Sequence, residues 1–333
     1  MPEITKPAHA VLREICMDSR KSTSDIAKAV KLSRGTVQVI IHKLETALAL
    51  HYVPEFDLSR LGFVLSYTIK VKLRPGMDIK RLRKALEEST PVQFAAVTKG
   101  DFDLFIFVTT SDPIEFIRWE NKFRAEFAEM IATWETVHVV FNRLGFFPVK
   151  DSAIVGADVP AEQKKLLLGL NGNARISFTA LARDTGLTLA IARYQFRKVL
   201  KEGYVKRFSA VLEKPPTNVN LIVFVSYAMR ADHEERSRRA RRVLMKENEF
   251  QPTNTWAIVA ETSGTSDTLR LGSFESVKDA YETLGELDSI YGGPEFIRNQ
   301  SAIVVDVLVG AWPSRNVDLG KCYDMTSWRK KDE

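Results

Sequence analysis

Side chains that can bind DNA recur at helical spacing in one stretch of the sequence, residues 189–201. Arginine can bind a guanine edge through two hydrogen bonds, glutamine can pair with an adenine edge, and lysine binds phosphate. A helix with these side chains on its exposed face can therefore enter a groove of DNA. The alternative is an ordinary helix with a solvated basic face. The candidate residues are Arg193, Gln195, Arg197, Lys198 and Lys201.

Two short helices joined by a tight turn would position these side chains. Ser177 and Thr188 are of types that cap helices, and each precedes a segment with apolar residues at helical spacing. Gly186 lies between the two segments, where glycine tolerates a positive φ. Such a pair forms a helix-turn-helix, whose second helix enters the major groove of DNA. The apolar stripe expected on that second helix is Ile191, Ala192, Phe196, Val199 and Leu200.

The same pattern occurs 155 residues earlier in the chain, which predicts an internal duplication. Ser22 and Ser33 stand where the later copy has Ser177 and Thr188. Lys31 replaces the glycine of the turn, so we expect the earlier copy to bind DNA more weakly or to have a structural role. Its outward-facing candidates for DNA binding are Arg34, Gln38, His42 and Lys43.

A segment of alternating strands and helices follows each helix-turn-helix. In residues 63–73 apolar side chains occupy the odd positions, and polar ones such as Thr68 and Lys70 occupy the even positions, which predicts a half-buried strand. The complete order is β-α-β-β-α-β, which is typical of the ferredoxin-like fold. The same order recurs after Pro215, with a charged helix expected at about residues 232–245.

The sequence therefore predicts an α+β fold with two winged-type helix-turn-helix domains and two ferredoxin-like domains in tandem. Because each predicted sheet has an apolar face to bury, we expect the two sheets to pair as an internal pseudo-dimer and the chain to form a homodimer. The predicted boundaries are 1–60 and 161–214 for the helix-turn-helix domains, 61–148 and 215–310 for the ferredoxin-like domains, 149–160 for a linker and 311–333 for a tail.

The segments predicted to bind DNA carry more positive charge than the chain as a whole, whose net charge is +6. Residues 160–214 contain 11 Lys and Arg against 4 Asp and Glu, and residues 6–60 contain 9 against 6. The chain lacks an apolar run long enough to cross a bilayer, and Cys16 and Cys322 form no disulfide or metal pattern. We expect a cytoplasmic protein that is not an enzyme and has no catalytic residues, metal, cofactor or membrane partner.

Three segments together resemble the Lrp/AsnC family of transcription regulators. They are LARDTGLTLAIARYQFRKVLKEGYVKRFSAVL, GDFDLFIFV and GTSDTLRLG. The resemblance implies a sequence-specific regulator that binds double-stranded DNA, with two family units fused in one chain. It also implies that a small-molecule effector such as an amino acid binds at the two Gly-x-x-Asp turns. The residues concerned are Gly100, Asp103, Gly264, Ser266 and Asp267.

Three alternatives stay open. The two turns can be purely structural, with glycine allowing the tight bend and aspartate capping it. The chain can also be a chromatin-like protein that binds DNA without sequence preference or effector. Sirohaem decarboxylases share this architecture, but we expect His and Arg on their second strands. Here the corresponding segments are Val92-Gln93-Phe94 and Trp256-Ala257-Ile258.

Overall fold

The computed structural model describes residues 5–76, 78–212, 219–227, 255–291 and 296–313. The charged helix expected at 232–245 and nearly all of the tail lie outside these residues. The described helices are α1 (Lys6–Met17), α2 (Thr23–Val30), α3 (Arg34–Ala47), α4 (Ile79–Glu88), α5 (Pro113–Glu126), α6 (Asp151–Gly156), α7 (Ala161–Gly172), α8 (Phe178–Thr185), α9 (Leu189–Lys201) and α11 (Val277–Tyr291). The described strands are β1 (Leu50–Phe56), β2 (Leu65–Leu73), β3 (Val92–Gly100), β4 (Leu104–Thr110), β5 (Ile131–Leu144), β6 (Val205–Leu212), β7 (Val219–Tyr227), β8 (Thr255–Ser263), β9 (Thr268–Phe274) and β10 (Phe296–Val309).

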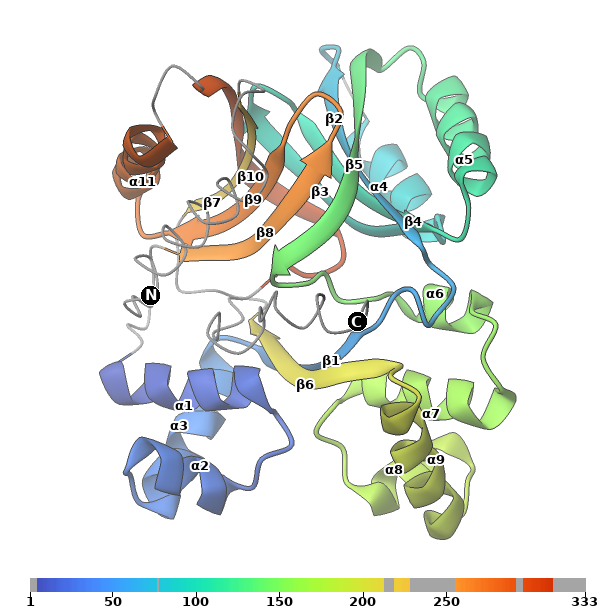
Figure 1. Cartoon of the computed structure of the whole chain (residues 1–333), viewed down its shortest axis with the longest axis vertical. Helices are drawn as coiled ribbons and strands as arrows, with labels where there is room; N and C mark the ends of the chain where they lie inside the picture. The colour runs from blue at the N-terminus through green and yellow to red at the C-terminus, as the bar shows by residue number, and fades with distance from the viewer. Residues whose placement is uncertain (1–4, 77, 213–218, 228–254, 292–295, 314–333) are drawn as a thin grey trace, which may run out of the picture.

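Two groups of helices lie on one side of the molecule and a closed barrel of strands on the other (Figure 1). Helices α1 to α3 form the first group and α7 to α9 form the second. An antiparallel pair, β1 and β6, runs between the helices and the barrel and joins the two groups. The mixed helix-and-sheet class expected from the sequence is therefore confirmed.

The caps predicted for the second helical group are confirmed. The Ser177 hydroxyl accepts a hydrogen bond from the amide of Ala180, and the Thr188 hydroxyl accepts one from the amide of Ile191, both at 3.2 Å. Gly186 ends α8 with a φ of 68°, in the left-handed region. These local signals set the ends of α8 and α9 and thereby the angle at which α9 leaves the turn.

Lys31 occupies the same left-handed position at the end of α2, with a φ of 56°. A residue with a Cβ is strained in this region by roughly 1–2 kcal/mol, and glycine is not. We therefore expect Lys31→Gly to raise the midpoint of thermal unfolding. Lys28→Gly is the matched control, because Lys28 is exposed inside α2 and glycine there weakens the helix. A fall in the midpoint for both variants would contradict this account.

Apart from β1 and β6, the described strands form one closed barrel in the order β10-β3-β4-β2-β5-β8-β9-β7. The first four strands of the ferredoxin-like segments pair as β3-β4-β2-β5, and the second four as β8-β9-β7-β10, so both have the same internal order. Antiparallel pairs join them at two edges, β5 with β8 and β10 with β3. The two sheets therefore meet along their edges and enclose a shared interior between their apolar faces.

The barrel interior is packed mostly with aromatic and aliphatic side chains, while helices cover the outside. Helices α4 and α5 bury an apolar cluster against the outer face of the first sheet, and α11 does so against the second. The buried aromatic residues of the interior are Phe94, Phe102, Phe105, Phe107, Phe147, Phe224 and Trp312.

The segment predicted as a linker, 149–160, contains α6 and contributes to the core of the second helical group. Ala153 and Ile154 are fully buried there, beside Leu167 of α7. The segment was predicted to be a linker, and its small apolar residues pack against leucines of α7. The segment is thus a structural part of the second group.

Candidate functional site

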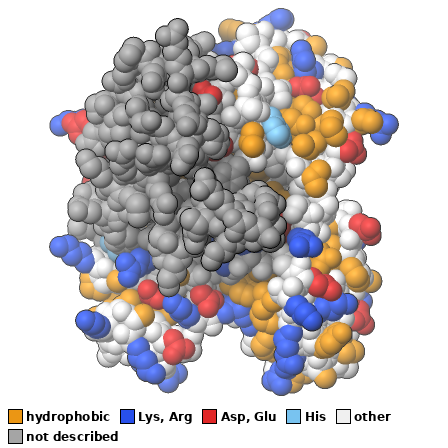
Figure 2. All heavy atoms as spheres, viewed as in Figure 1, with side chains coloured by type: hydrophobic (Ala, Val, Ile, Leu, Met, Phe, Trp, Pro, Cys, Tyr) orange, Lys and Arg blue, Asp and Glu red, His pale blue; other side chains and the backbone are white. Residues whose placement is uncertain are grey.

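The exposed face of α9 carries the candidate side chains Arg193, Arg197 and Lys201 together (Figure 2 shows Lys and Arg gathered over both helical groups). Their spacing of four residues places them on one stripe of the helix. Within the described part of the chain, Arg197 and Lys201 make no ion pair, so their charges face solvent. Lys198 lies at the edge of this face, 3.9 Å from the carboxylate of Glu202.

Gln195 does not belong to this exposed face, and the prediction that it binds DNA is corrected. Its side chain is 7% exposed, and its amide donates a hydrogen bond of 2.5 Å to the carboxylate of Glu162. The buried stripe of α9 runs through Ala192, Gln195 and Val199, at the i, i+3, i+7 positions. A polar side chain can occupy this stripe because α7 supplies its hydrogen-bond partner.

Two residues of the predicted apolar stripe lie on the border of the helix instead. Ile191 and Leu200 are each exposed, at 37% and 39%. Tyr194 was not among the predicted site residues, and it is 62% exposed. Tyr194 is adjacent to Arg193 and three residues before Arg197, so it stands between the basic side chains. A plot of helical positions around Arg197 and Lys201 would have found it.

Helix α3 presents all of its predicted candidates to solvent, as a less basic surface. Arg34, Gln38, His42 and Lys43 are exposed, and Ser33 caps the helix through the amide of Thr36. In the 155-residue alignment, Gln38 and His42 stand where α9 has Arg193 and Arg197. The two exposed helix faces therefore differ in charge although their backbones have the same arrangement of caps. All four side chains are where the sequence placed them.

The first Gly-x-x-Asp turn, residues 100–103, is a junction between the two sheets. Asp101 donates its backbone N–H to the carbonyl of Ser301 and accepts the Ser301 N–H on its carboxylate, at 2.9 and 2.7 Å. Asp103 accepts a hydrogen bond of 3.0 Å from the amide of Leu73 and lies 3.3 Å from the Lys72 ammonium. The described contacts therefore favour the structural alternative for Gly100 and Asp103.

Gly100 itself allows β3 and β10 to approach closely. A Cβ at this position would lie 2.4 Å from the carbonyl oxygen of Ser301 and 2.8 Å from Cα of Ala302. Both are backbone atoms, which cannot move without opening the junction. We expect Gly100→Ala to lower the unfolding midpoint clearly. Gly264→Ala is the control, because its added Cβ meets nothing within 4 Å. Equal falls in the midpoint for the two variants would show that the strain of a positive φ requires glycine at position 100, and not the close approach of β3 and β10.

The second turn, residues 264–267, is held by hydrogen bonds of its own sheet. Ser226 donates to the carbonyl of Thr265 at 2.8 Å, and Thr262 donates to the carbonyl of Ser266 at 2.7 Å. The Asp267 amide donates to the carbonyl of Val225. Ser266 is buried, whereas Thr265 reaches out of the turn toward the first sheet. The turn therefore presents Thr265 to strand β5 of the first sheet.

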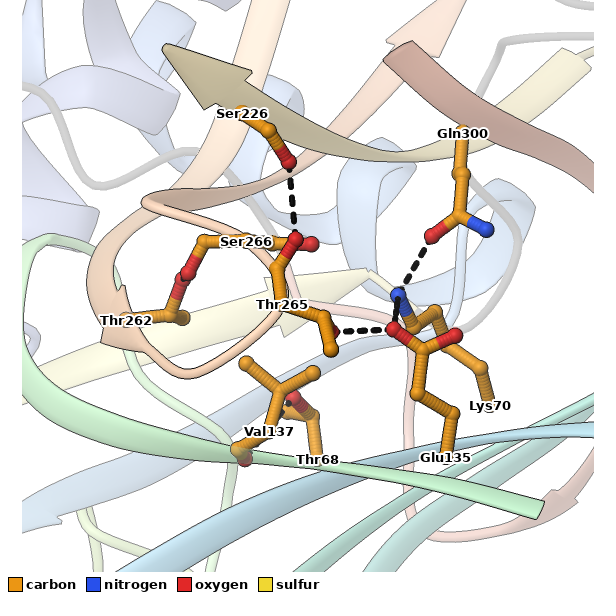
Figure 3. Close-up of polar contacts among 9 residues, drawn as sticks. All are labelled: Thr68, Lys70, Glu135, Val137, Ser226, Thr262, Thr265, Ser266 and Gln300. Carbon is orange, nitrogen blue, oxygen red and sulfur yellow. Dashed lines mark hydrogen bonds and ion pairs between the residues drawn. The ribbon is translucent and has the colours of Figure 1, made fainter. Parts of the chain in front are cut away.

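A charged cluster that the sequence did not indicate lies beside this turn (Figure 3). The Lys70 ammonium is 2.6 Å from the carboxylate of Glu135 and 2.5 Å from the side-chain oxygen of Gln300, and it lies 4.5 Å from the centre of the Phe224 ring. Thr265 donates a hydrogen bond to the same carboxylate. Side chains of β2, β5, β7 and β10 thus converge on one ammonium group.

Lys70 was predicted to lie on the solvent-facing side of a half-buried strand, and this prediction is wrong. Lys70 is 3% exposed and Thr68 is fully buried, because the second sheet closes over that face of β2. The cluster is also asymmetric. Lys70 pairs in register with Glu135 in the first sheet, and Phe224 pairs in register with Gln300 at the same strand positions of the second.

No group of three or more His, Cys, Asp or Glu side chains in the described ranges is arranged to hold a metal ion. Among the described helices, none has the length and apolar character that crossing a membrane requires.

Comparison with known proteins gives partial matches, and no family model matches the chain. The HTH-type transcriptional regulator LysM of Sulfurisphaera tokodaii is 27% identical over 110 residues, which cover 33% of this chain and 78% of the regulator. About a third of the chain is thus similar in sequence to a helix-turn-helix regulator. The structure of E. coli AsnC is 21% identical and covers 42% of this chain and 93% of its own, with a TM-score of 0.37.

One solved structure covers nearly the whole chain. The siroheme decarboxylase NirDL matches 98% of this chain and 100% of its own, with a TM-score of 0.60 and 12% identity. A second structure of the same decarboxylase is a complex with an iron-uroporphyrin III analogue, and it has a TM-score of 0.58. At this level of identity the likeness is one of fold.

Proposed function

We propose that this protein is a DNA-binding transcription regulator of the Lrp/AsnC type, with two regulator units fused in one chain. The observation that carries the proposal is the exposed basic face of α9, where Arg193, Arg197 and Lys201 follow a capped turn. This is the geometry in which a recognition helix presents side chains to a major groove. The sequence similarity to a helix-turn-helix regulator supports it.

In this proposal the helices α3 and α9 bind unequal half-sites. Arg193 and Arg197 supply guanidinium groups that can bind guanine edges, whereas Gln38 and His42 supply weaker, less charged donors and acceptors at the same positions. The site is then an asymmetric duplex in the cytoplasm, unless a second copy of the chain restores symmetry by forming a homodimer. An internal duplication would account for this arrangement, because it would place two recognition helices in one chain.

We further propose that an effector such as an amino acid binds at the second Gly-x-x-Asp turn. Gly264, Ser266 and Asp267 shape this turn, and the ammonium of Lys70 and the carboxylate of Glu135 lie beside it. Opposite charges within one cluster match the two charged ends of a zwitterion. The first turn already forms hydrogen bonds with β10, so we do not propose it as the effector site.

The test is a salt titration of binding to two duplexes, a random one and the DNA upstream of the gene for this chain. Tighter binding to the second, with a difference that persists as salt rises, supports a sequence-specific regulator. Equal binding with a steep salt dependence would instead support a chromatin-like role. Absence of binding at low salt would remove the proposal. The twenty amino acids are then added one at a time to measure shifts in affinity.

An enzyme is the second candidate, because the decarboxylase shares the fold over almost the full length of the chain. Our proposal is that the chain is not an enzyme. On β3 and β8, where a decarboxylase is expected to carry His or Arg, this chain has Phe94 and Ile258, both buried in the aromatic core. A change in the absorption spectrum when an iron tetrapyrrole is added to the protein, followed by loss of carbon dioxide, would overturn this choice.

A further inference from the structure

Arg20 of the first helical group inserts into the second. It lies in the loop between α1 and α2, and its guanidinium donates a hydrogen bond of 2.7 Å to the carbonyl of Ala174, in the loop between α7 and α8. The same guanidinium lies 5.2, 4.9 and 5.4 Å from the ring centres of Phe178, Phe196 and Phe208. Burial lowers the pKa of Arg20 below its ordinary value. One of these rings, Phe196, belongs to α9.

Arg175 makes the reciprocal contact, 155 residues later in the equivalent loop. It donates a hydrogen bond of 3.5 Å to the carbonyl of Lys21, and its guanidinium lies 5.3 Å from the ring centre of Tyr52 on β1. Tyr52 in turn donates a hydrogen bond of 2.6 Å to the carboxylate of Glu45 on α3. Each arginine therefore connects its own loop to a recognition helix or its support in the opposite group.

These contacts add to the pairing of β1 with β6 and to the packing of α1 against Ala210 and Leu212 of β6. Strands β1 and β6 pair along their length, and the Ser19 amide donates to the carbonyl of Phe208 at 3.0 Å. A two-stranded ribbon can twist and bend, so the helices that pack on it can change their mutual angle as it does. A planar guanidinium packed on aromatic rings and bonded to a carbonyl restricts that angle.

We propose that Arg20 and Arg175 are positioning residues that fix the distance and orientation between α3 and α9, and that they thereby set the spacing of the two DNA half-sites. The proposal rests on the proposed function for its consequence in DNA binding, whereas the clamp itself is a property of the protein alone. Its partner is a duplex whose half-sites stand at one fixed separation. Two flexibly tethered domains would accept a range of separations.

The first experiment measures the clamp without DNA. Spin labels are placed on the full chain at two exposed helix positions, Ala29→Cys on α2 and Thr179→Cys on α8, with Cys322→Ser as the background. Pulsed electron paramagnetic resonance is expected to give a narrow distribution of distances between the two labels. This distribution should broaden in the Arg20→Ala variant. Arg118→Ala, at an exposed site on α5, is the control and should leave it narrow. An unchanged width in Arg20→Ala overturns the proposal.

Loss of folding is separated from loss of positioning by two further variants. Arg20→Lys keeps the charge but not the planar group that packs on the rings. Compared with Arg20→Ala, it should therefore recover much of the unfolding midpoint, while the distance distribution stays broad. Arg175→Ala removes the reciprocal contact and should broaden the distribution by itself. Circular dichroism of each variant checks that the helices remain. A narrow distribution in both folded variants overturns the proposal.

The second experiment uses a duplex selected by the unaltered protein from a random library. Spacers between its halves are varied one base pair at a time across one turn, about 10 base pairs. The unaltered chain should prefer one spacing by about 10-fold or more, and the Arg20→Ala, Arg175→Ala variant should fall to about 3-fold or less. A preserved preference overturns the proposal. If the unaltered chain binds no duplex, the proposed function fails, and the distance measurement still decides on the clamp.

Discussion

Replacing Arg193 and Arg197 together with alanine is expected to weaken binding to the selected duplex by about 30- to 1,000-fold. Both side chains are exposed on α9, four residues apart, and both can bind a base edge or a phosphate. Each lost base contact costs about 1–3 kcal/mol, and each lost phosphate contact lowers the slope of affinity against salt by about one. Fluorescence anisotropy at several salt concentrations measures both quantities.

The control for this variant removes the same charge elsewhere. Arg118→Ala, Lys122→Ala changes two exposed residues of α5, which lies on the barrel away from the helical groups (Figure 1). This variant should bind the duplex only slightly more weakly, because it loses the same two positive charges at a site away from the helical groups. Equal losses in the two variants would show that binding depends on the overall field of the protein and that α9 is not the reading helix.

The corresponding double variant of α3, Arg34→Ala, Gln38→Ala, tests the asymmetry of the two groups. It removes one positive charge instead of two, from a face that is less basic at the aligned positions. The affinity should therefore fall less than for α9. A larger fall would assign the tighter half-site to the first group, against the ranking that we derive from residue type.

Local features of the fold could be predicted from the sequence because short-range chemistry determines them. Ser177, Thr188 and Gly186 cap α8 and α9 as expected, and Asp112 caps α5 through the amides of Ile114 and Glu115. Serine, threonine and aspartate satisfy free amides at a helix start wherever the rest of the chain lies. Alternation likewise located β2.

Features that depend on distant segments could not be predicted in this way. The burial of Lys70 depends on a sheet that begins about 150 residues later in the sequence, and alternation alone reads its face as solvated. The burial of Gln195 depends on Glu162 being within reach on α7. In both cases the polar residue type is compatible with burial only because the tertiary structure provides a partner, which a periodic pattern does not encode.

The arginines at positions 20 and 175 show the same limit in another form. Their equivalence is visible in the sequence, since they stand 155 residues apart. Only the structure shows that each crosses to the opposite group, where Arg20 packs on three phenylalanine rings. The duplication predicted from spacing therefore indicates which residues correspond, while the contacts between the copies follow from the pairing of β1 with β6.

Glu135→Gln is expected to destabilise the barrel more than Lys70→Met, although both variants break the same ion pair. The Lys70 side chain is 3% exposed and the Glu135 side chain is 32% exposed. Glu135→Gln leaves a buried ammonium whose facing carboxylate has been replaced by a neutral amide, and such a loss costs about 3–5 kcal/mol in a buried pair. Lys70→Met leaves a carboxylate that water can reach, while methionine can pack against the Phe224 ring.

Thermal unfolding of the two single variants and of the double variant Lys70→Met, Glu135→Gln measures this difference. The double variant should unfold at a higher temperature than Glu135→Gln, because removing the ammonium relieves the charge that the first substitution left buried. The order expected for the midpoint is therefore Lys70→Met above or level with the double variant, and both above Glu135→Gln. The reverse order for the single variants would mean that the ammonium of Lys70 is solvated and does not depend on Glu135. The expected order would instead show that the ammonium of Lys70 is stable under the second sheet only because the carboxylate of Glu135, on the neighbouring strand β5, neutralises it.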